Sequence, residues 1–221
     1  GLLFGEEVDE VEIMENKIKF IVSIKNGQKT GFFLDQREMR NWVQELSEGK
    51  KVLNCFGYTG GFSLYAMKGG ATQVDTVDIS TDAIGLAQKN TSLNKIDADK
   101  HNFIAEDVFQ FLREKPLEYD LIILDPPAFT KRKTDIIQAC RGYKDINRLA
   151  IKKIPSGSLL LTSSCSYHID EKLFQTVVFQ AAAEAGRSVR IIGRHRLALD
   201  HPINIFHPEG EYLKSLLLFI E

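Results

Sequence analysis

Cysteine, net charge and long apolar runs are all scarce in this chain of 221 residues, and each shortage excludes a class of protein. The three cysteines, Cys55, Cys140 and Cys165, are odd in number and lack the spacing of a disulfide framework or a metal site. We therefore expect a reducing compartment, the cytoplasm, and no metal. No apolar run approaches the ~20 residues that a membrane span requires, so no membrane association is expected.

The formal net charge of −2 excludes a protein that binds nucleic acid through an overall basic charge. The charge is nevertheless uneven. Between Phe129 and Pro155 only Asp135 and Asp145 are acidic. The basic residues of this stretch are Lys131, Arg132, Lys133, Arg141, Lys144, Arg148, Lys152 and Lys153. This basic patch predicts a surface that contacts phosphates, with a solvated helix face as an equal alternative.

The start of the chain has a different hydrophobic pattern from the rest. Residues 1–35 include an alternating stretch, VEIMENKIKFIVSI, which predicts a β-hairpin extension with turns at residues 15–16 and 25–27. From Gln36 to Leu46 the apolar residues fall at helical spacing, and Gly49 ends that helix. We therefore divide the chain into an extension, residues 1–35, and a main domain, residues 36–221.

Short apolar runs alternate with helical stretches after residue 50, which predicts an α/β fold with a mostly parallel sheet and helices on both faces. Helices are expected to start near Thr59, Ser80, Asp107, Asp135 and Ile169, with Ser80 and Asp107 as N-caps and negative charge from Asp135 and Asp170 in a first turn. Seven strands are expected, at residues 51–55, 72–78, 101–106, 119–125, 158–164, 188–195 and 212–220. The connections allow the last pair to run antiparallel.

The turn after the first strand of this sheet, NCFGYTGGFS, indicates the kind of ligand. It matches neither G-x-G-x-x-G nor G-x-x-x-x-G-K-[ST], so a pyrophosphate cradle is not expected. Gly60 and Gly61 still allow a ligand to approach the backbone. Asp78, at the end of the second strand, can accept hydrogen bonds from ribose hydroxyls, and Asp107 can hold a purine amino group. With LDPPAF after the fourth strand, these features favour a nucleoside without diphosphate, and S-adenosylmethionine fits.

Taken together, the motifs resemble class I S-adenosylmethionine-dependent methyltransferases, and more closely the RlmI-type family of bacterial 23S ribosomal RNA cytosine-C5 methyltransferases. The resemblance is carried by GQKTGFFLDQREMR, VLNCFGYTGGFSLYA, VDIS, LDPPAFTKRK, RGYKDINRLA, LTSSCSYH and DHPINIFHPEGEYLK. The class has three alternating glycines after the first strand. Here Phe56 and Tyr58 occupy the first two places and Gly60 the third, a departure that the RlmI type shares.

The resemblance implies a Rossmann-like methyltransferase domain at residues 36–221 with S-adenosylmethionine as cofactor. It also implies an RNA-binding domain of the PUA type upstream. Because the first residue is Gly rather than Met, we expect that this domain has been removed. The cofactor is expected over residues 54–60, enclosed by the LDQR segment. The residues expected to bind it are Leu34, Asp35, Gln36, Arg40, Asn54, Phe56, Tyr58, Thr59, Gly60, Asp78, Ile79, Ser80, Asp107, Val108, Asp125 and Pro126.

Cytosine-C5 methylation needs a nucleophile, because carbon 5 of cytosine does not attack a methyl donor unaided. A thiolate that adds to carbon 6 activates carbon 5. We therefore assign Cys165 as the nucleophile and Asp125 as the hydrogen-bond partner of ring nitrogen 3. The expected substrate is RNA, and more specifically 23S rRNA. The residues expected to contact it are Pro127, Phe129, Lys131, Arg132, Lys133, Arg141 and Lys144. A homodimer is a further possibility.

Three alternatives stay open at the level of sequence. The same fold methylates ring or amino nitrogens, of guanine for example, without a covalent cysteine. The chain could also bind cofactor and RNA without catalysing a reaction. For single residues, Cys165 could be a small core residue, and Phe129 could pack in the core rather than stack on a base.

Overall fold

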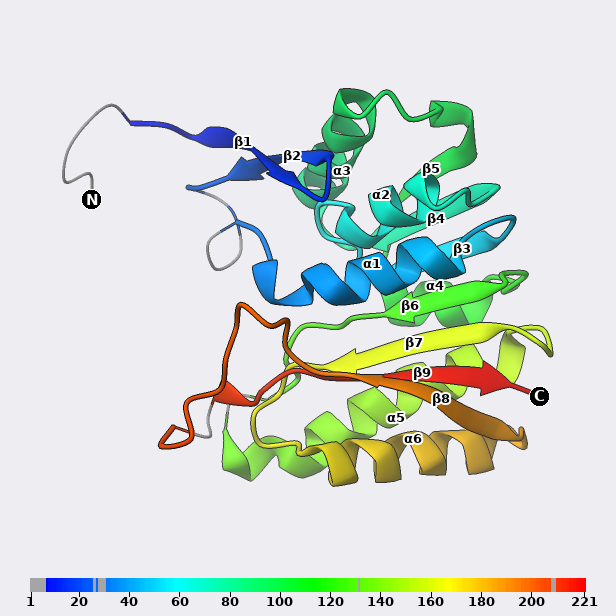
Figure 1. Ribbon diagram of the computed structural model, residues 1–221. Helices are drawn as coiled ribbons and strands as arrows, with labels where there is room; N and C mark the ends of the chain where they lie inside the picture. Colours follow the sequence, from blue (N-terminus) through cyan, green and yellow to red (C-terminus); the bar gives the residue numbers. More distant parts are fainter. Residues whose placement is uncertain (1–6, 26, 28–30, 131, 208–209) are drawn as a thin grey trace.

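A computed structural model describes residues 7–25, 27, 31–130, 132–207 and 210–221 (Figure 1). Its centre is a seven-stranded sheet with the strand order β5-β4-β3-β6-β7-β9-β8. The strand β9 runs antiparallel to both of its neighbours, β7 and β8, and the other pairings are parallel. The strands are β3 (Lys51–Cys55), β4 (Gln73–Asp78), β5 (His101–Ala105), β6 (Leu121–Leu124), β7 (Leu159–Ser164), β8 (Val189–His195) and β9 (Lys214–Ile220). This confirms the predicted α/β class and its antiparallel last pair.

Helices cover both faces of the sheet because its strands carry apolar side chains on both sides. Val52 packs in the cluster that holds α1 and α2, whereas its neighbour Leu53 packs in the cluster that holds α4, α5 and α6 (Figure 1). The helices are α1 (Arg37–Leu46), α2 (Gly61–Lys68), α3 (Thr81–Leu93), α4 (Val108–Glu114), α5 (Ile136–Lys153) and α6 (Glu171–Ala185). Short 3-10 turns are η1 (Leu34–Gln36), η2 (Ala98–Lys100) and η3 (Lys133–Asp135).

Helix starts follow side-chain capping, as the sequence predicted for Ser80 and Asp107. Their side chains accept hydrogen bonds from the backbone N–H of Ala83 and Gln110. Asp170, expected in a first turn, is instead the N-cap of α6. Likewise Asp135 is the N-cap of α5, without a side-chain capping bond.

The N-terminal extension forms a separate two-stranded antiparallel sheet, β1 (Glu10–Glu15) and β2 (Ile18–Ser23). Its turn is at Asn16–Lys17, one residue later than predicted. Both residues have positive φ, 48° and 66°, as a two-residue turn of type I′ requires, whereas Glu15 still pairs with Ile18. The second expected turn includes Asn26, which lies outside the described residues.

Two asparagines, one in α3 and the other its C-cap, hold the hairpin on the main sheet's helices. The Oδ1 atoms of Asn90 and Asn94 accept hydrogen bonds from the backbone N–H of Ile21 and Lys19. On the edge that faces away from β1, these bonds take the place of hydrogen bonds to a neighbouring strand. The predicted division at residues 35 and 36 falls inside η1, which leads from this hairpin to α1. None of the helices in the described ranges is long and apolar enough to span a membrane.

Candidate active site

A cavity lies where the carboxyl ends of β3 to β7 meet, the edge at which open α/β sheets bind ligands. Its empty volume is about 1050 Å³, part of it open to solvent. The lining residues are Phe32, Phe33, Asp35, Gln36, Arg40, Phe56, Gly57, Tyr58, Thr59, Gly61, Phe62, Asp78, Ile79, Asp107, Val108, Asp125, Pro126, Pro127 and Cys165. The cavity therefore brings the predicted nucleophile, Cys165, together with most of the residues predicted for the cofactor.

The floor of the cavity is the turn after β3, whose backbone keeps a conformation that suits glycine. Phe56, Tyr58 and Gly60 all have positive φ, at 58°, 45° and 80°. The two aromatic residues thus hold the left-handed conformation at places where the methyltransferase class has glycine. Their rings are supported by neighbours, because Phe56 packs edge-on against Phe109 and Tyr58 against Phe33.

Asp78 fixes this turn from the end of β4. Its Oδ2 accepts a 2.9 Å hydrogen bond from the backbone N–H of Tyr58, and its Oδ1 accepts one of 2.9 Å from Ser80 N–H. Gly57 lies so close to β4 that a Cβ atom there would be 2.4 Å from Cγ2 of Thr76. The position of Asp78 at the cavity wall therefore depends on a glycine at 57.

One wall is formed by the segment from Phe32 to Arg40. The amide Nε2 of Gln36 donates a 2.8 Å hydrogen bond to Oδ2 of Asp125, and Tyr212 donates its hydroxyl proton to the carboxylate of buried Asp35. Gln36, which was predicted to bind the cofactor, thus orients the carboxyl group of Asp125, which was predicted to act on the substrate.

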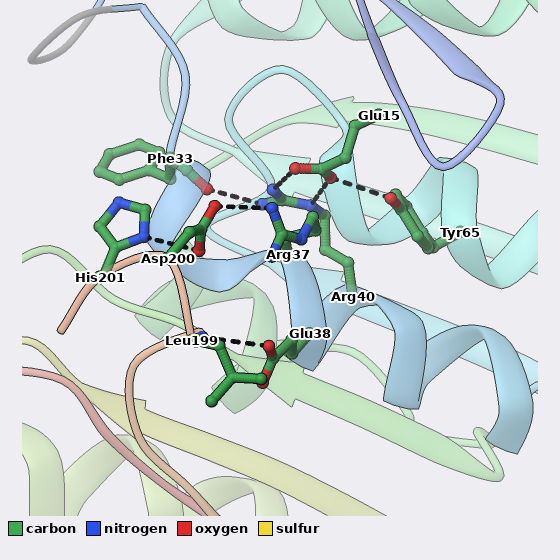
Figure 2. A network of polar contacts seen from close by, with 9 residues as sticks. All are labelled: Glu15, Phe33, Arg37, Glu38, Arg40, Tyr65, Leu199, Asp200 and His201. Carbon is green, nitrogen blue, oxygen red and sulfur yellow. Dashed lines mark hydrogen bonds and ion pairs between the residues drawn. The ribbon is translucent and has the colours of Figure 1, made fainter.

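Arg40 lies in this wall, but its guanidinium faces the hairpin (Figure 2). Nε and Nη2 each lie 2.7 Å from an oxygen of Glu15, and Nη1 donates to the carbonyl of Phe33. Tyr65 donates a further hydrogen bond to Glu15. Arg40 is 2% exposed, so its charge is satisfied inside the protein and its effect on the cavity is to hold the Phe33 backbone.

Cys165 follows β7 and Asp125 follows β6, on adjacent parallel strands. The Sγ atom of Cys165 lies 3.9 Å from the carbonyl oxygen of Pro126, which places the thiol beside the DPP loop. Cys55, by contrast, is fully buried and does not line the cavity, and burial raises the pKa of its thiol. Of the cysteines, Cys165 is therefore the one that a cavity ligand can reach.

Four residues predicted for the cofactor do not line the cavity: Leu34, Asn54, Gly60 and Ser80. Leu34 is 50% exposed and Ser80 is a helix cap. Asn54 is buried and donates to Ser63, so it supports the turn from below. Conversely, Phe32, Phe33 and Phe62 line the cavity without having been predicted, whereas Gly57 and Gly61 lie in the turn that was expected to admit the ligand. The GFF triplet before LDQR was a usable signal for the two phenylalanines, since it continues the segment expected to enclose the cofactor.

Of the predicted substrate residues that the structure describes, Pro127 alone lines the cavity. Phe129 does not, and its ring lies 4.6 Å from that of buried Tyr143, as a core residue would. Lys144 pairs with Glu184 at 2.6 Å. Lys131 lies outside the described residues. Arg132, Lys133 and Arg141 are exposed and form no ion pair with another described residue.

The C-terminal half of the basic patch is also occupied within the protein. Arg148 pairs with Asp145, and Lys153 donates to the carbonyl groups of Leu112 and Arg113 at the end of α4. Such bonds satisfy the last carbonyls of a helix. Apart from exposed Lys152 in the last turn of α5, the cations left for a partner therefore lie around the start of that helix.

The acidic lining of the cavity suits a cationic nucleoside. Four carboxyl groups face it, those of Asp35, Asp78, Asp107 and Asp125, and its one cation, Arg40, is already paired. Such a site disfavours phosphate groups and favours hydroxyl and ammonium groups. Apolar side chains such as Ile79 and Val108 can enclose a base. The donor set therefore fits S-adenosylmethionine. Within the described ranges, no group of three or more His, Cys, Asp or Glu could hold a metal ion.

A comparison with family models adds the deciding observation. The model of the S-adenosylmethionine-dependent methyltransferases matches residues 1–202. The chain belongs to this methyltransferase family. The match confirms S-adenosylmethionine as the predicted cofactor.

Relatives of this methyltransferase are named as methyltransferases of large-subunit ribosomal RNA. It is 48% identical over 222 residues to "Ribosomal RNA large subunit methyltransferase I" of Aeromonas salmonicida, covering 99% of this chain and 56% of the relative. The Aeromonas hydrophila protein of the same name is 47% identical over 223 residues, with the same coverage. These relatives confirm the resemblance seen in the motifs. The chain spans about half the length of the curated relatives it matches.

Among solved structures, SMU.776 complexed with SAH superposes with a TM-score of 0.85 at 28% identity, covering 98% of this methyltransferase and 57% of that chain. The similarity confirms the methyltransferase fold over nearly the whole chain.

Proposed function

We propose that this methyltransferase forms 5-methylcytosine in large-subunit ribosomal RNA, in the cytoplasm, through a transient bond between Cys165 and the base. The name shared by the relatives supports the RNA substrate. The observation that carries the cytosine-C5 chemistry is that Cys165 and Asp125 line one cavity, side by side after adjacent strands. A methyltransferase acting on nitrogen needs no thiol at this edge.

The chemistry assigns one task to each side chain. S-adenosylmethionine supplies the methyl group. The Sγ of Cys165 bonds to carbon 6 of cytosine, and the Asp125 carboxyl group gives a proton to ring nitrogen 3, which takes the charge that arrives on the ring. Carbon 5 then takes the methyl group, whose bond to the donor's sulfonium sulfur breaks. A base removes the proton from carbon 5, the bond between carbon 6 and Sγ breaks to restore the thiolate, and ring nitrogen 3 returns its proton to Asp125.

Gln36 and Pro127 prepare the site for this reaction. The amide of Gln36 holds one oxygen of Asp125, so the carboxyl group keeps a single orientation. The prolines of the DPP loop stiffen the chain between Asp125 and the base. Because the cavity lies at a sheet edge, the target cytosine has to be flipped out or single-stranded to enter. Exposed Arg132, Lys133 and Arg141 are the residues that we expect to contact the phosphates of the RNA.

The test measures which atom of the RNA is methylated. The full-length gene product is incubated with labelled S-adenosylmethionine and unmodified large-subunit RNA, and the product nucleoside is identified by mass spectrometry. We expect 5-methylcytosine, and we expect Cys165→Ala to lower the rate at least about 1000-fold, because the covalent step is lost. The matched control is Cys140→Ala, which removes a thiol of α5 outside the cavity and should retain activity.

Two results would contradict the proposal. One is a methyl group found on a nitrogen atom. The other is undiminished turnover by Cys165→Ala. Equilibrium dialysis with labelled cofactor should show that the variant still binds it, so that loss of binding does not explain loss of rate.

A further inference from the structure

Lys214, the first residue of β9, is a buried cation with no carboxylate partner among the described residues. It is 5% exposed, and no Asp or Glu of the described ranges lies within 4.0 Å of its Nζ atom. Lysine is rarely buried without a partner, because removing its charge from water is costly. Its burial therefore requires a local reason.

The surroundings of Lys214 are the residues on either side of Cys165. In the antiparallel pairing of β7 and β9, Lys214 lies opposite Ser164. Its Nζ donates a 2.7 Å hydrogen bond to the backbone carbonyl of Ser166. Ser166 in turn bonds through its hydroxyl to that of Tyr143, 3.0 Å away. Both neighbours of Cys165 are thus held by β9 and α5.

Lys214 does not line the cavity, so it cannot touch the substrate. It acts on the site through its charge. Burial lowers the pKa of Lys214 to about 8, while the charges of Cys165, Asp170 and Glu211 oppose that shift, Cys165 most strongly. The ammonium form therefore still predominates at neutral pH.

The other titratable groups near Cys165 are the carboxyl group of Asp125, which lines the same cavity, and two tyrosines. Burial raises the pKa of Tyr143 to about 12, and it also raises the pKa of Tyr212, so both are neutral at pH 7. Asp170 caps α6 and Glu211 pairs with Arg196. Lys214 is thus the cation of β9 whose charge interacts with that of Cys165.

We propose that Lys214 is a positioning residue whose buried ammonium group stabilises the thiolate of Cys165. This inference rests on the function proposed above, in which that thiolate is the nucleophile. The thiolate is the reactive form of cysteine, and an adjacent cation in a water-poor site favours it. The hydrogen bond to the carbonyl of Ser166 fixes the cation at the residue that follows Cys165. This also gives Lys214 a partner charge, which accounts for its burial.

The test follows the reactivity of Cys165 without any RNA. Alkylation by iodoacetamide is measured by mass spectrometry from pH 5.5 to 10 in the full chain carrying Cys140→Ser, so that Cys165 is the accessible thiol. We expect Lys214→Met to move the midpoint of the alkylation profile upward by about one pH unit or more, and to slow alkylation at pH 7 about tenfold. Lys214→Arg keeps the charge and should stay within about threefold of the parent.

Profiles of Lys214→Met that coincide with the parent would overturn the inference, and so would a Lys214→Arg variant that behaves like Lys214→Met. If Lys214→Met does not fold, as judged by circular dichroism, the Lys214→Arg profile decides alone: a midpoint shifted by a unit or more contradicts the role of charge. The proposed function fails separately, through methylation by Cys165→Ala, and leaves this measurement unaffected.

Discussion

His101 is buried at the start of β5 within a chain of hydrogen bonds that supports the cavity floor from below. Asn54 donates to Ser63, whose hydroxyl bonds to Thr76, and Thr76 and Thr91 bond to the two ring nitrogens of His101. Burial lowers the pKa of His101 to about 4. The imidazole is therefore neutral in the folded protein at pH 7, and its role is structural.

This pKa predicts a loss of stability in mild acid. The unfolded chain binds a proton at His101 near pH 6.5, whereas the folded protein binds one only near pH 4. The stability that neutral His101 contributes is therefore fully present above pH 6.5 and is lost as the pH falls toward 4. Between pH 7.5 and 4.5 the free energy of unfolding should fall by about 2 to 3 kcal/mol more in the parent than in His101→Gln. Urea denaturation at several pH values measures this.

Exposed His207 offers the matched control, since His207→Gln should follow the parent across the whole range. Parallel losses in the parent and in His101→Gln would show that His101 does not titrate as described.

At this residue scale, sequence predicts side chains that directly follow strands and misses those whose role depends on distant partners. Asp78, Asp107, Asp125 and Cys165 could be selected because apolar runs mark the ends of their strands. Asn54 is an example, since nothing local in the sequence indicates that its amide donates a hydrogen bond to Ser63.

The turn after β3 is the element that most directly shapes the cavity. Its residues Phe56 and Tyr58 keep the left-handed conformation in this protein without being glycine. The sequence motif revealed the departure from glycine but not the conformation. Gly57, between them, is required for a different reason, which is its contact with Thr76.

The prediction for this element compares two glycines. Gly57→Ala should lower the free energy of unfolding by about 1 to 3 kcal/mol and weaken cofactor binding, because the new methyl group would overlap Thr76. Gly85→Ala, in α3 with open space around it, should raise stability by about 0.5 to 1 kcal/mol and leave binding unchanged. Urea denaturation and calorimetric titration with S-adenosylmethionine measure both. Equal effects of the two substitutions would refute the role given to Gly57.

For the whole molecule, the N-terminal end of α1 joins parts that lie far apart in the chain (Figure 2). On one side Arg40 binds Glu15 of the hairpin. On the other side Arg37 pairs with Asp200, and Glu38 accepts a hydrogen bond from the backbone N–H of Leu199, in the segment between β8 and β9. These contacts frame the wall that holds Asp35 and Gln36. Sequence predicted the hairpin and the helix, but their pairing could not be predicted because these contacts span 25 to 163 residues.

Removal of the hairpin's carboxylate should therefore affect the cavity. Glu15→Ala leaves the Arg40 charge buried without its partner, and we expect a loss of about 3 to 5 kcal/mol in unfolding free energy together with weaker cofactor binding. Arg37→Ala breaks a more exposed ion pair and should cost under about 1 kcal/mol. If denaturation curves place the two losses within error of each other, the buried pair is not what anchors the hairpin.

The place of β9 between β7 and β8 also has a consequence for synthesis. On a translating ribosome β7 emerges about fifty residues before β9. Until β9 arrives, β7 remains an open edge that can recruit foreign strands, and Cys165 lacks the cation that we assign to it. The arrival of β9 would then activate the Cys165 nucleophile and cover the open edge of β7 in the same folding event.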